Sequence, residues 1–199
     1  MKVILGLGNP GRQYEATRHN VGWWVLDHLA DVWHFEGWKR DHDALVANVM
    51  VGGTRTRLIK PLTYMNLSGQ VLKNYLRRPF WSPARDMLVV VDDVALPVGR
   101  FRIRPRGSAG GHNGLRSVEV ALGNQEYPRL RIGVGPSEER KQIYHDLSDF
   151  VLAPFAGDER DEILALMPVV EGAIGTWIRE GVERAMNSYN KGASALESE

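Results

Sequence analysis

The stretch Lys2-Val3-Ile4-Leu5-Gly6-Leu7-Gly8-Asn9-Pro10-Gly11 decides how the rest of the chain is arranged. Its first four residues form an apolar, β-branched run closed by glycine, which is typical of a buried strand. Gly6 and Gly8 remove side chains where the strand ends. Because Pro10 fixes φ and withholds a donor, the backbone must turn sharply after Asn9. The Asn9 amide therefore projects from the carboxyl end of a strand, where open α/β sheets bind ligands.

The same glycines also match the dinucleotide-binding pattern Gly-x-Gly-x-x-Gly. That motif needs a helix that opens on its third glycine and an acidic residue about twenty positions later, at the end of a second strand. Here Pro10 interrupts the loop and residues 13–18 separate it from the next helix. Asp27 and Asp31 fall inside that helix. The sequence therefore disfavours a nucleotide site.

Apolar periodicity predicts the remaining elements. Expected strands, besides the first, are Ala44–Val51, Thr54–Pro61, Met87–Val91, Arg100–Arg104 and Arg129–Val134. Expected helices are Val21–Trp33, about Gly69–Leu76, Leu115–Leu122, a short piece near Tyr144–Val151, and Asp158 to about Tyr189. The pair Gly52-Gly53 predicts a hairpin between two of the strands. We further expect a loop over Phe35–Asp43, a helix cap at Asn66 or Ser68, and a kink at Pro168.

Strands that alternate with helices, together with one hairpin, predict an α/β fold. We expect a single compact domain over residues 1–190, built on a twisted mixed, mostly parallel sheet with helices on both faces. Residues 191–199 are small and polar, which predicts a flexible C-terminal tail.

Composition narrows the class of protein. The chain has 199 residues, of which 43% are hydrophobic and 25% charged, as is ordinary for a globular protein. It contains no cysteine, which removes disulfides, a thiolate nucleophile and cysteine-based zinc sites. With no long apolar stretch and no signal-peptide pattern, a soluble cytoplasmic protein without membrane contact is expected.

The net charge of +1 conceals an uneven distribution. Residues 96–131 contain seven arginines and two acids, whereas residues 132–166 contain eight acids and three basic residues. Such a patch on a near-neutral protein suggests a localised polyanion site. The alternative is a solvated strand face, because Arg100, Arg102, Arg104 and Arg106 alternate along the chain.

Asn9, Asn66 and Asp92 follow predicted strands, so their side chains can converge above one sheet edge. The polar groups that the predicted loops present are Asn9, Tyr14, His19, Asn66, Asp92, His112 and Asn113. There is no Gly-x-Ser-x-Gly elbow, and the histidines show no paired metal-binding spacing. A single histidine oriented by a carboxylate fits better, since imidazole takes protons from water near neutrality and a carboxylate fixes its tautomer. Each residue also has a purely structural alternative, such as a turn or helix cap, and spacing alone does not decide between them.

Five ordered motifs resemble the bacterial peptidyl-tRNA hydrolase family over Met1 to about Asn190: Gly6–Gly11 with Tyr14, Thr17–Gly22, Pro61–Gly69, Gly110–Gly114 and Arg129–Gly135. The resemblance implies a hydrolase that cleaves the ester between a peptide, or an N-blocked aminoacyl group, and the 3′ ribose of tRNA. It further implies recycling of tRNA after premature ribosome drop-off, with no metal and no cofactor.

The resemblance also assigns roles to residues. His19 would be the general base for water, and Asp92 would hold it in its basic form. Asn9 would contact the first amide of the peptide. Tyr14, Tyr64, Met65, Asn66 and Asn113 would line the groove for the peptide and the 3′ CCA end, Arg104 and Arg131 would grip the phosphate backbone of the acceptor stem, and Ser137–Asp149 would form a mobile lid. We expect a monomer with no protein partner.

Two features depart from the family's usual pattern. After the central strand the family commonly shows Asp-Glu-Leu-Asp-Leu-Pro, where this chain has Asp92-Asp93-Val94-Ala95-Leu96-Pro97. Ala95 thus replaces an acid, for which we expect a tuned pocket, and Asp93 is the fallback orienting carboxylate. Tyr64 stands where phenylalanine is also common. The alternatives to a hydrolase are an RNA-binding protein that uses the groove without hydrolysis and a nucleotide-dependent oxidoreductase.

Overall fold

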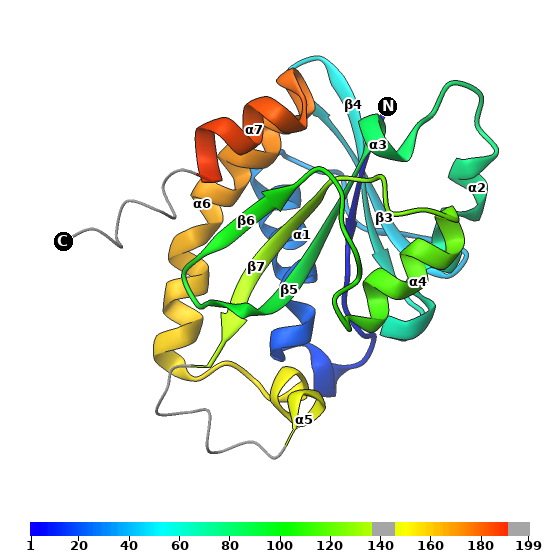
Figure 1. Ribbon diagram of the computed structural model, residues 1–199. Helices are drawn as coiled ribbons and strands as arrows, with labels where there is room; N and C mark the ends of the chain where they lie inside the picture. Colours follow the sequence, from blue (N-terminus) through cyan, green and yellow to red (C-terminus); the bar gives the residue numbers. More distant parts are fainter. Residues whose placement is uncertain (137–145, 191–199) are drawn as a thin grey trace.

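The computed structural model describes residues 1–136 and 146–190, in which seven strands form one mixed sheet of order β2-β3-β4-β1-β5-β7-β6 (Figure 1). The strands are β1 (Lys2–Gly6), β2 (Lys39–Asp41), β3 (Ala44–Val51), β4 (Thr54–Pro61), β5 (Met87–Pro97), β6 (Phe101–Arg104) and β7 (Arg129–Gly135). Strands β4, β1, β5 and β7 run parallel in the centre. Strands β3 and β6 pair antiparallel to their inner neighbours. The expected mixed, mostly parallel sheet is thus confirmed.

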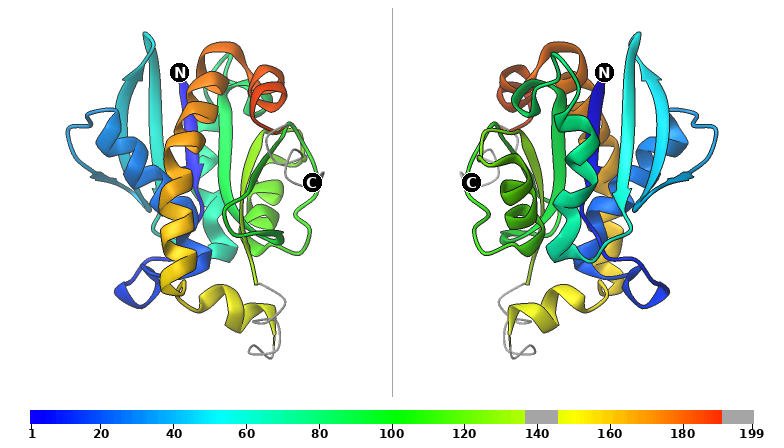
Figure 2. Two further views of the ribbon diagram at one scale, coloured as in Figure 1. Left: turned by 90° about the vertical axis from the view of Figure 1, so that its left-hand side faces the viewer. Right: turned by 90° about the vertical axis from the view of Figure 1, so that its right-hand side faces the viewer.

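Helices cover both faces of this sheet (Figure 2). The α-helices are α1 (Val21–Val32), α2 (Lys73–Leu76), α3 (Pro83–Asp86), α4 (Asn113–Leu122), α5 (Leu147–Leu152), α6 (Gly157–Glu180) and α7 (Val182–Tyr189). Three 3-10 helices are η1 (Arg12–Tyr14), η2 (Arg18–Asn20) and η3 (Met65–Leu72). Helices α1, α6 and α7 pack on one face, whereas η3, α2 and α4 pack on the other.

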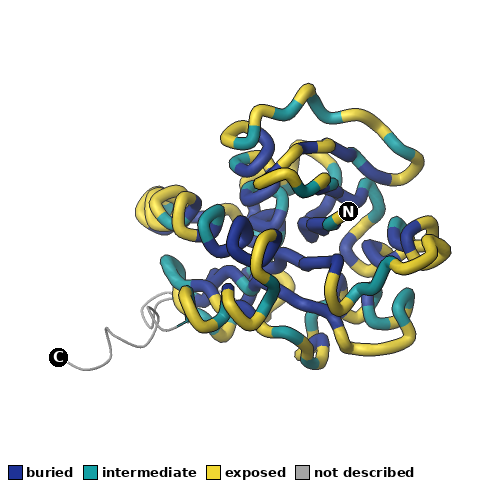
Figure 3. The backbone as a smooth tube through the Cα atoms, turned by 90° about the horizontal axis from the view of Figure 1, so that it is seen from above, coloured by how far each residue is buried: buried dark blue, intermediate teal, exposed yellow. Residues whose placement is uncertain are grey.

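The central strands are buried on both sides, which explains their unbroken apolar sequences. Ile4 of β1 belongs to the core under α1 and α6, whereas its neighbours Val3 and Leu5 belong to the core under η3 and α4. All three side chains are fully buried. Figure 3 shows the same arrangement, with buried backbone in the centre and exposed backbone around it.

The strand order creates a switch point between β1 and β5. The chain leaves β1 through α1 to build β2, β3 and β4 on one side, and then crosses over to β5 on the other side. Ligands bind outside the carboxyl ends of the strands at such a point. Asn9 follows β1, and Asp92 lies midway along β5, two residues beyond Val90, where the pairing of β5 with β1 ends at Gly6. The topology therefore brings these two polar residues to one edge of the sheet.

The main difference from the sequence prediction concerns β5. The apolar run predicts a strand that ends at Val91, but β5 continues to Pro97, with Asp92 paired to Ile132 and Asp93 to Gly133. The pairing becomes irregular only between Asp93 and Pro97. Asp92 is therefore held by sheet hydrogen bonding and not by a flexible loop.

Other predictions need smaller corrections. The expected loop over Phe35–Asp43 contains β2, and α3 was not predicted. The segment before α2 is the 3-10 helix η3, in which neither Asn66 nor Ser68 caps the start; the Ser68 hydroxyl donates to the Met65 carbonyl instead. The helix expected from Asp158 to about Tyr189 is divided into α6, which contains Pro168, and α7, with the break at Gly181, where φ is 90°.

The predicted hairpin is confirmed, because Gly52 and Gly53 join β3 to β4 with φ values of 54° and 78°. The proposed tail and residues 137–145 of the proposed lid lie outside the described residues. Among the described helices, none combines the length and the apolar character needed to cross a membrane.

Gly22 provides a test of how tightly α1 is seated on the sheet. A Cβ at Gly22 would lie 2.5 Å from the Leu7 carbonyl oxygen and 2.7 Å from that of Val90, both backbone atoms. We expect Gly22→Ala to lower the free energy of unfolding by about 3 kcal/mol, the upper end of the overpacking range. Urea denaturation measures this change.

Gly157→Ala is the matched control, because a Cβ at Gly157 would meet nothing within 4 Å. At the start of α6 it should leave the free energy of unfolding within about 1 kcal/mol of wild type. If the two substitutions lowered the free energy of unfolding equally, close packing of α1 against the sheet at Gly22 would be contradicted.

Candidate active site

A cleft of about 790 Å³ opens at the carboxyl ends of the central strands. Eight of the ten residues to which the family resemblance assigned roles line it: Asn9, His19, Tyr64, Met65, Asn66, Asp92, Asn113 and Arg131. The far wall comes from α5, which contributes Leu147, Val151 and Leu152. The cleft thus has a polar floor at the sheet edge and an apolar wall on α5.

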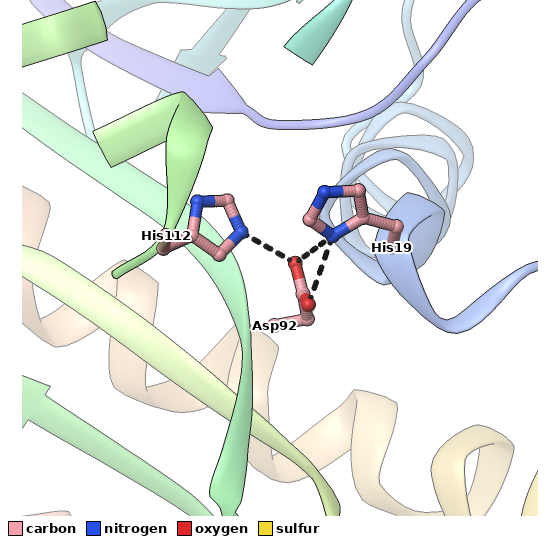
Figure 4. Close-up of side chains that lie close together, drawn as sticks. All are labelled: His19, Asp92 and His112. Carbon is pink, nitrogen blue, oxygen red and sulfur yellow. Dashed lines mark hydrogen bonds and ion pairs between the residues drawn. The ribbon is translucent and has the colours of Figure 1, made fainter. Parts of the chain in front are cut away.

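His19 and Asp92 are in hydrogen-bond contact. The Nδ1 atom of His19, on η2, lies 3.0 Å from each carboxylate oxygen of Asp92 (Figure 4). The Asp92 side chain is 2% exposed and that of His19 is 12% exposed. Because the carboxylate only accepts, Nδ1 carries the proton and Nε2 keeps its lone pair. The ring of His19 therefore presents a basic nitrogen on its side away from Asp92.

A second imidazole shares the same carboxylate. Nε2 of His112 lies 2.8 Å from Asp92 Oδ1, while its Nδ1 accepts the backbone N–H groups of Gly114 at 3.1 Å and Leu115 at 3.3 Å. His112 is thus the N-cap of α4, a role that requires Nδ1 to be unprotonated. Its remaining proton sits on Nε2 and is donated to Asp92.

The two imidazoles determine the charge of Asp92. Burial alone would raise the pKa of the Asp92 carboxyl, but the electrostatic effects of His112 and His19 and their hydrogen bonds outweigh it and hold that pKa well below its usual value. Asp92 is consequently a buried anion whose compensation comes from two side chains on different elements.

His19, Asp92 and His112 also form a group that could in principle ligate a metal ion, with candidate ligand atoms within 4.8 Å of one another. Their contacts of 2.8 and 3.0 Å are hydrogen-bond distances. Ligands around a tetrahedral zinc ion at about 2.1 Å stand roughly 3.4 Å apart. The donor set as arranged fits a proton network better than a zinc site.

The Asn9 side chain has a fixed orientation. Its Oδ1 accepts the backbone N–H of Met65 at 2.8 Å, so the amide nitrogen Nδ2 is the atom available to the cleft. The Asn9 backbone exchanges two hydrogen bonds with the Asn20 side chain, at 2.8 and 2.9 Å. Asn9 is 6% exposed. The loop thus presents one donor, suited to a carbonyl oxygen.

Arg18 fixes the segment that carries His19. Its guanidinium donates to Glu159 at 2.6 Å and to the carbonyls of Ala153 and Pro154, and it stacks 4.3 Å from the Phe150 ring. Arg18 is 1% exposed and Glu159 4%. Because Phe150 lies on α5 and Glu159 on α6, this anchor joins η2 to the α5 wall of the cleft.

The other predicted residues are distributed as follows. Asn66 and Asn113 are exposed on the cleft rim, as is Tyr64, which is 58% exposed. The Nε of Arg131 lies 2.8 Å from Asp93, so that carboxylate is engaged by an arginine and does not orient His19. Tyr14 and Arg104 lie outside the cleft lining, and Arg104 is exposed on the edge strand β6.

Sequence reasoning collected His112 among the polar groups but gave it no role. The signal that could have found it is its position before Asn113-Gly114, where a side-chain acceptor begins a helix. Arg18 gave no signal, because its partners Glu159 and Phe150 are more than a hundred residues away in sequence. The lid expected over Ser137–Asp149 includes Leu147 of the α5 wall, but Val151 and Leu152 were not indicated as cleft residues.

His112 separates two contributions to stability. His112→Ala removes the α4 cap and a hydrogen bond to a buried carboxylate, for which we expect a loss of about 2–4 kcal/mol in the free energy of unfolding. His112→Asn keeps a capping side chain, so its loss should be about 1 kcal/mol smaller. Urea denaturation at neutral pH measures both, and equal losses would contradict the capping role.

Comparisons with known proteins agree with this geometry. The sequence model of the family described as peptidyl-tRNA hydrolase matches residues 3–197. The peptidyl-tRNA hydrolase of Gemmatimonas aurantiaca is 53% identical over 191 residues, which cover 96% of this chain and 100% of that protein. That of Fervidobacterium nodosum is 43% identical over 188 residues, covering 94% and 95%.

Solved structures give the same result. The crystal structure of peptidyl-tRNA hydrolase from Acinetobacter baumannii matches with a TM-score of 0.80 and 32% identity, covering 94% of this chain and 93% of that one. The fold, the ordered motifs and these relatives together show that the chain belongs to the peptidyl-tRNA hydrolase family.

Proposed function

We propose that the protein hydrolyses the ester between a peptide, or an N-blocked aminoacyl group, and the 3′ ribose of tRNA, with His19 as general base and Asp92 as its orienting carboxylate. The family and fold support peptidyl-tRNA hydrolysis. The observation that carries the mechanism is the His19–Asp92 contact of 3.0 Å beneath an open cleft. The reaction would free tRNA for reuse after premature ribosome drop-off.

The proposed reaction follows from the tautomer of His19. Its Nε2 takes a proton from water as the oxygen attacks the ester carbonyl, and the buried anion Asp92 stabilises the imidazolium that forms. The same proton then passes to the ribose 3′ oxygen as the ester bond breaks. General-base help of this kind contributes roughly 10²- to 10⁴-fold to the rate. The chain's own residues supply every proton transfer in this scheme.

Amide donors in the cleft are suited to the substrate's carbonyl groups. We propose that Asn9 Nδ2 donates to a carbonyl oxygen next to the first peptide amide, and that Asn66 and Asn113 position the scissile ester and the terminal nucleoside. Tyr64 and Met65 contribute the surface for the 3′ CCA end and the peptide, and the α5 wall faces peptide side chains. Tyr14 remains a proposed contact for the peptide.

The arginines of β6 and β7 are suited to phosphate. Arg102 pairs with Arg131 and Arg104 with Arg129 across these antiparallel strands, so all four point to one face. Arg131 also lines the cleft. We propose that Arg131 and Arg104 neutralise the phosphate backbone of the acceptor stem, a salt-sensitive form of binding. The substrate-binding residues proposed above all come from one copy of the chain, and we propose that it acts as a monomer. We further propose that it acts in the cytoplasm.

His19→Ala is the decisive test. Without the base, turnover of N-acetyl-aminoacyl-tRNA should fall about 10²- to 10⁴-fold, while the Kd for tRNA stays close to wild type. Ester cleavage and tRNA binding are measured separately. His28→Ala is the control, because His28 lies on α1 beside Glu171, away from the cleft. Wild-type turnover in His19→Ala would rule out the general base.

Two other outcomes address the alternatives. If pure wild-type protein binds tRNA but leaves the ester intact, the protein is an RNA-binding relative and not a hydrolase. The oxidoreductase alternative predicts nicotinamide binding, but η1, a 3-10 turn, follows Gly11 where the dinucleotide motif needs a helix. Cofactor fluorescence should therefore show no binding.

Asn9→Asp tests the donor role of Asn9. The new carboxylate still accepts the Met65 N–H, but it presents no proton to the cleft and adds a charge near Asp92. We expect kcat/KM for N-acetyl-aminoacyl-tRNA to fall about 10²-fold or more, as when a buried hydrogen bond to substrate is lost. A change of less than threefold would contradict the role. Asn124→Asp, on an exposed loop, is the control.

A further inference from the structure

A second basic surface lies on α2 and the loop that follows it. We define this α2 surface by Lys73, Arg77, Arg78, Phe80 and Arg85. The 25 residues from Pro61 to Arg85 contain these four cations and no Asp or Glu. The arginine patch of residues 96–131 is separate in sequence, and four of its seven arginines lie on β6 and β7.

Phe80 is the unusual member of this surface. Its side chain is 94% exposed, and its backbone has φ 63°, the left-handed region that a bulky residue rarely adopts. A large aromatic side chain in that position gains nothing from burial and bears a backbone cost of order 1–3 kcal/mol. The stability of the fold therefore does not explain why an aromatic residue stands at position 80.

The loop on either side of Phe80 is anchored. The Trp81 ring packs 5.8 Å from that of Tyr75, and the Ser82 N–H donates to Asp86 at 2.9 Å. The guanidinium of Arg85 donates to the Phe80 carbonyl. These contacts hold the backbone while the Phe80 ring projects outward. The loop thus presents a preorganised aromatic face beside cationic side chains.

The location of the surface suits a long substrate. It lies on the same sheet face as α4, and it adjoins the start of β5 at Met87 (Figure 1). Asp92 is five residues further along this strand, roughly 17 Å at 3.3 Å per residue. A folded tRNA is longer than that. The opposite face is unsuited to a polyanion, because α6 carries six acidic and two basic residues.

We propose that the α2 surface binds tRNA nucleotides away from the 3′ end, with Phe80 stacking on an unpaired base and Arg77 and Arg78 contacting phosphates. This proposal rests on the proposed function. The charge favours RNA as the partner, since the exposed cations Lys73, Arg77 and Arg78 complement a phosphate backbone, whereas Arg85 is paired with Asp86. Aromatic stacking adds affinity without demanding a particular base. A hollow of about 370 Å³ next to α2 is lined by Lys73, Arg77 and Arg78 on one side and by Asp41, Asp43 and Arg57 on the other, so the cations that face it from the α2 surface are Lys73, Arg77 and Arg78.

The test compares two substrates of different length. One is full-length N-acetyl-aminoacyl-tRNA, and the other is the same ester on a short oligonucleotide ending in CCA. Phe80→Asn keeps a residue that tolerates the left-handed backbone and removes the ring. We expect it to raise KM for the full-length substrate about fivefold or more, with kcat unchanged. Arg77→Ala should reduce the salt slope of tRNA binding by about one. Neither variant should change kcat/KM for the short substrate.

Matched controls lie on the opposite face. Leu164 of α6 is 48% exposed and Arg160 is exposed nearby, so Leu164→Ala and Arg160→Ala remove similar groups and should leave both substrates unaffected. Phe80→Tyr keeps a stacking ring and should resemble wild type. Thermal unfolding verifies that each variant is folded, and Arg77→Ala, at an exposed position, tests the surface independently of the loop backbone.

Several results would overturn the proposal: an unchanged KM for full-length tRNA, equal losses on both substrates, or an effect confined to self-association or vesicle binding. Failure of the wild-type protein to cleave either ester would instead count against the proposed function. Cleavage of both esters by wild type, with no difference between variants, would reject the α2 surface alone.

Discussion

The candidate site depends on one buried anion. Asp92 accepts hydrogen bonds from His19 and from His112, and its compensation comes from η2 on one side and the start of α4 on the other. A buried carboxylate without partners would protonate, because desolvation penalises its charge. The two imidazoles therefore act together on Asp92. Each of them keeps the carboxylate charged, and that charge in turn fixes the tautomer of each ring.

The sheet topology makes this arrangement possible. Asp92 is part of β5, where it pairs with Ile132 of β7, and β5 is also paired with β1 over the residues just before it, from Met87 to Val90. The Asn9 loop leaves β1 next to it, and η2 leads directly into α1, which packs on β1 and β5 through Gly22. Each polar group is positioned by an element that is itself held by the core. The apolar wall of α5 completes the cleft from a distant part of the sequence.

Local patterns predicted much of this. The buried strands, the glycine hairpin and the first helix follow from apolar runs and turn residues, and the ordered motifs indicated His19, Asp92 and Asn9 through the family resemblance. The predicted end of β5 at Val91 was wrong, because acidic residues after an apolar run usually mark a turn. Here Asp92 and Asp93 remain in the strand, and their partners His19, His112 and Arg131 come together only in the tertiary structure. Arg18 illustrates the same limit. A buried arginine cannot be told from a surface arginine when its carboxylate lies 141 residues away.

The Arg18 anchor also has a consequence for cooperativity. Its guanidinium connects η2, the end of α5 and the first turn of α6, and the Thr17–Pro154 bridge adds a backbone link between the same segments. If one segment opened alone, a buried charge would be left unpaired, which costs free energy. Opening of all these segments together therefore costs less than the sum of separate openings. In native-state hydrogen exchange they should behave as one foldon. Fluctuations that fray the amino-terminal end of α6 would then reach the imidazole of His19 directly, and local stability at that helix end would limit the fraction of molecules in which His19 and Asp92 are in contact.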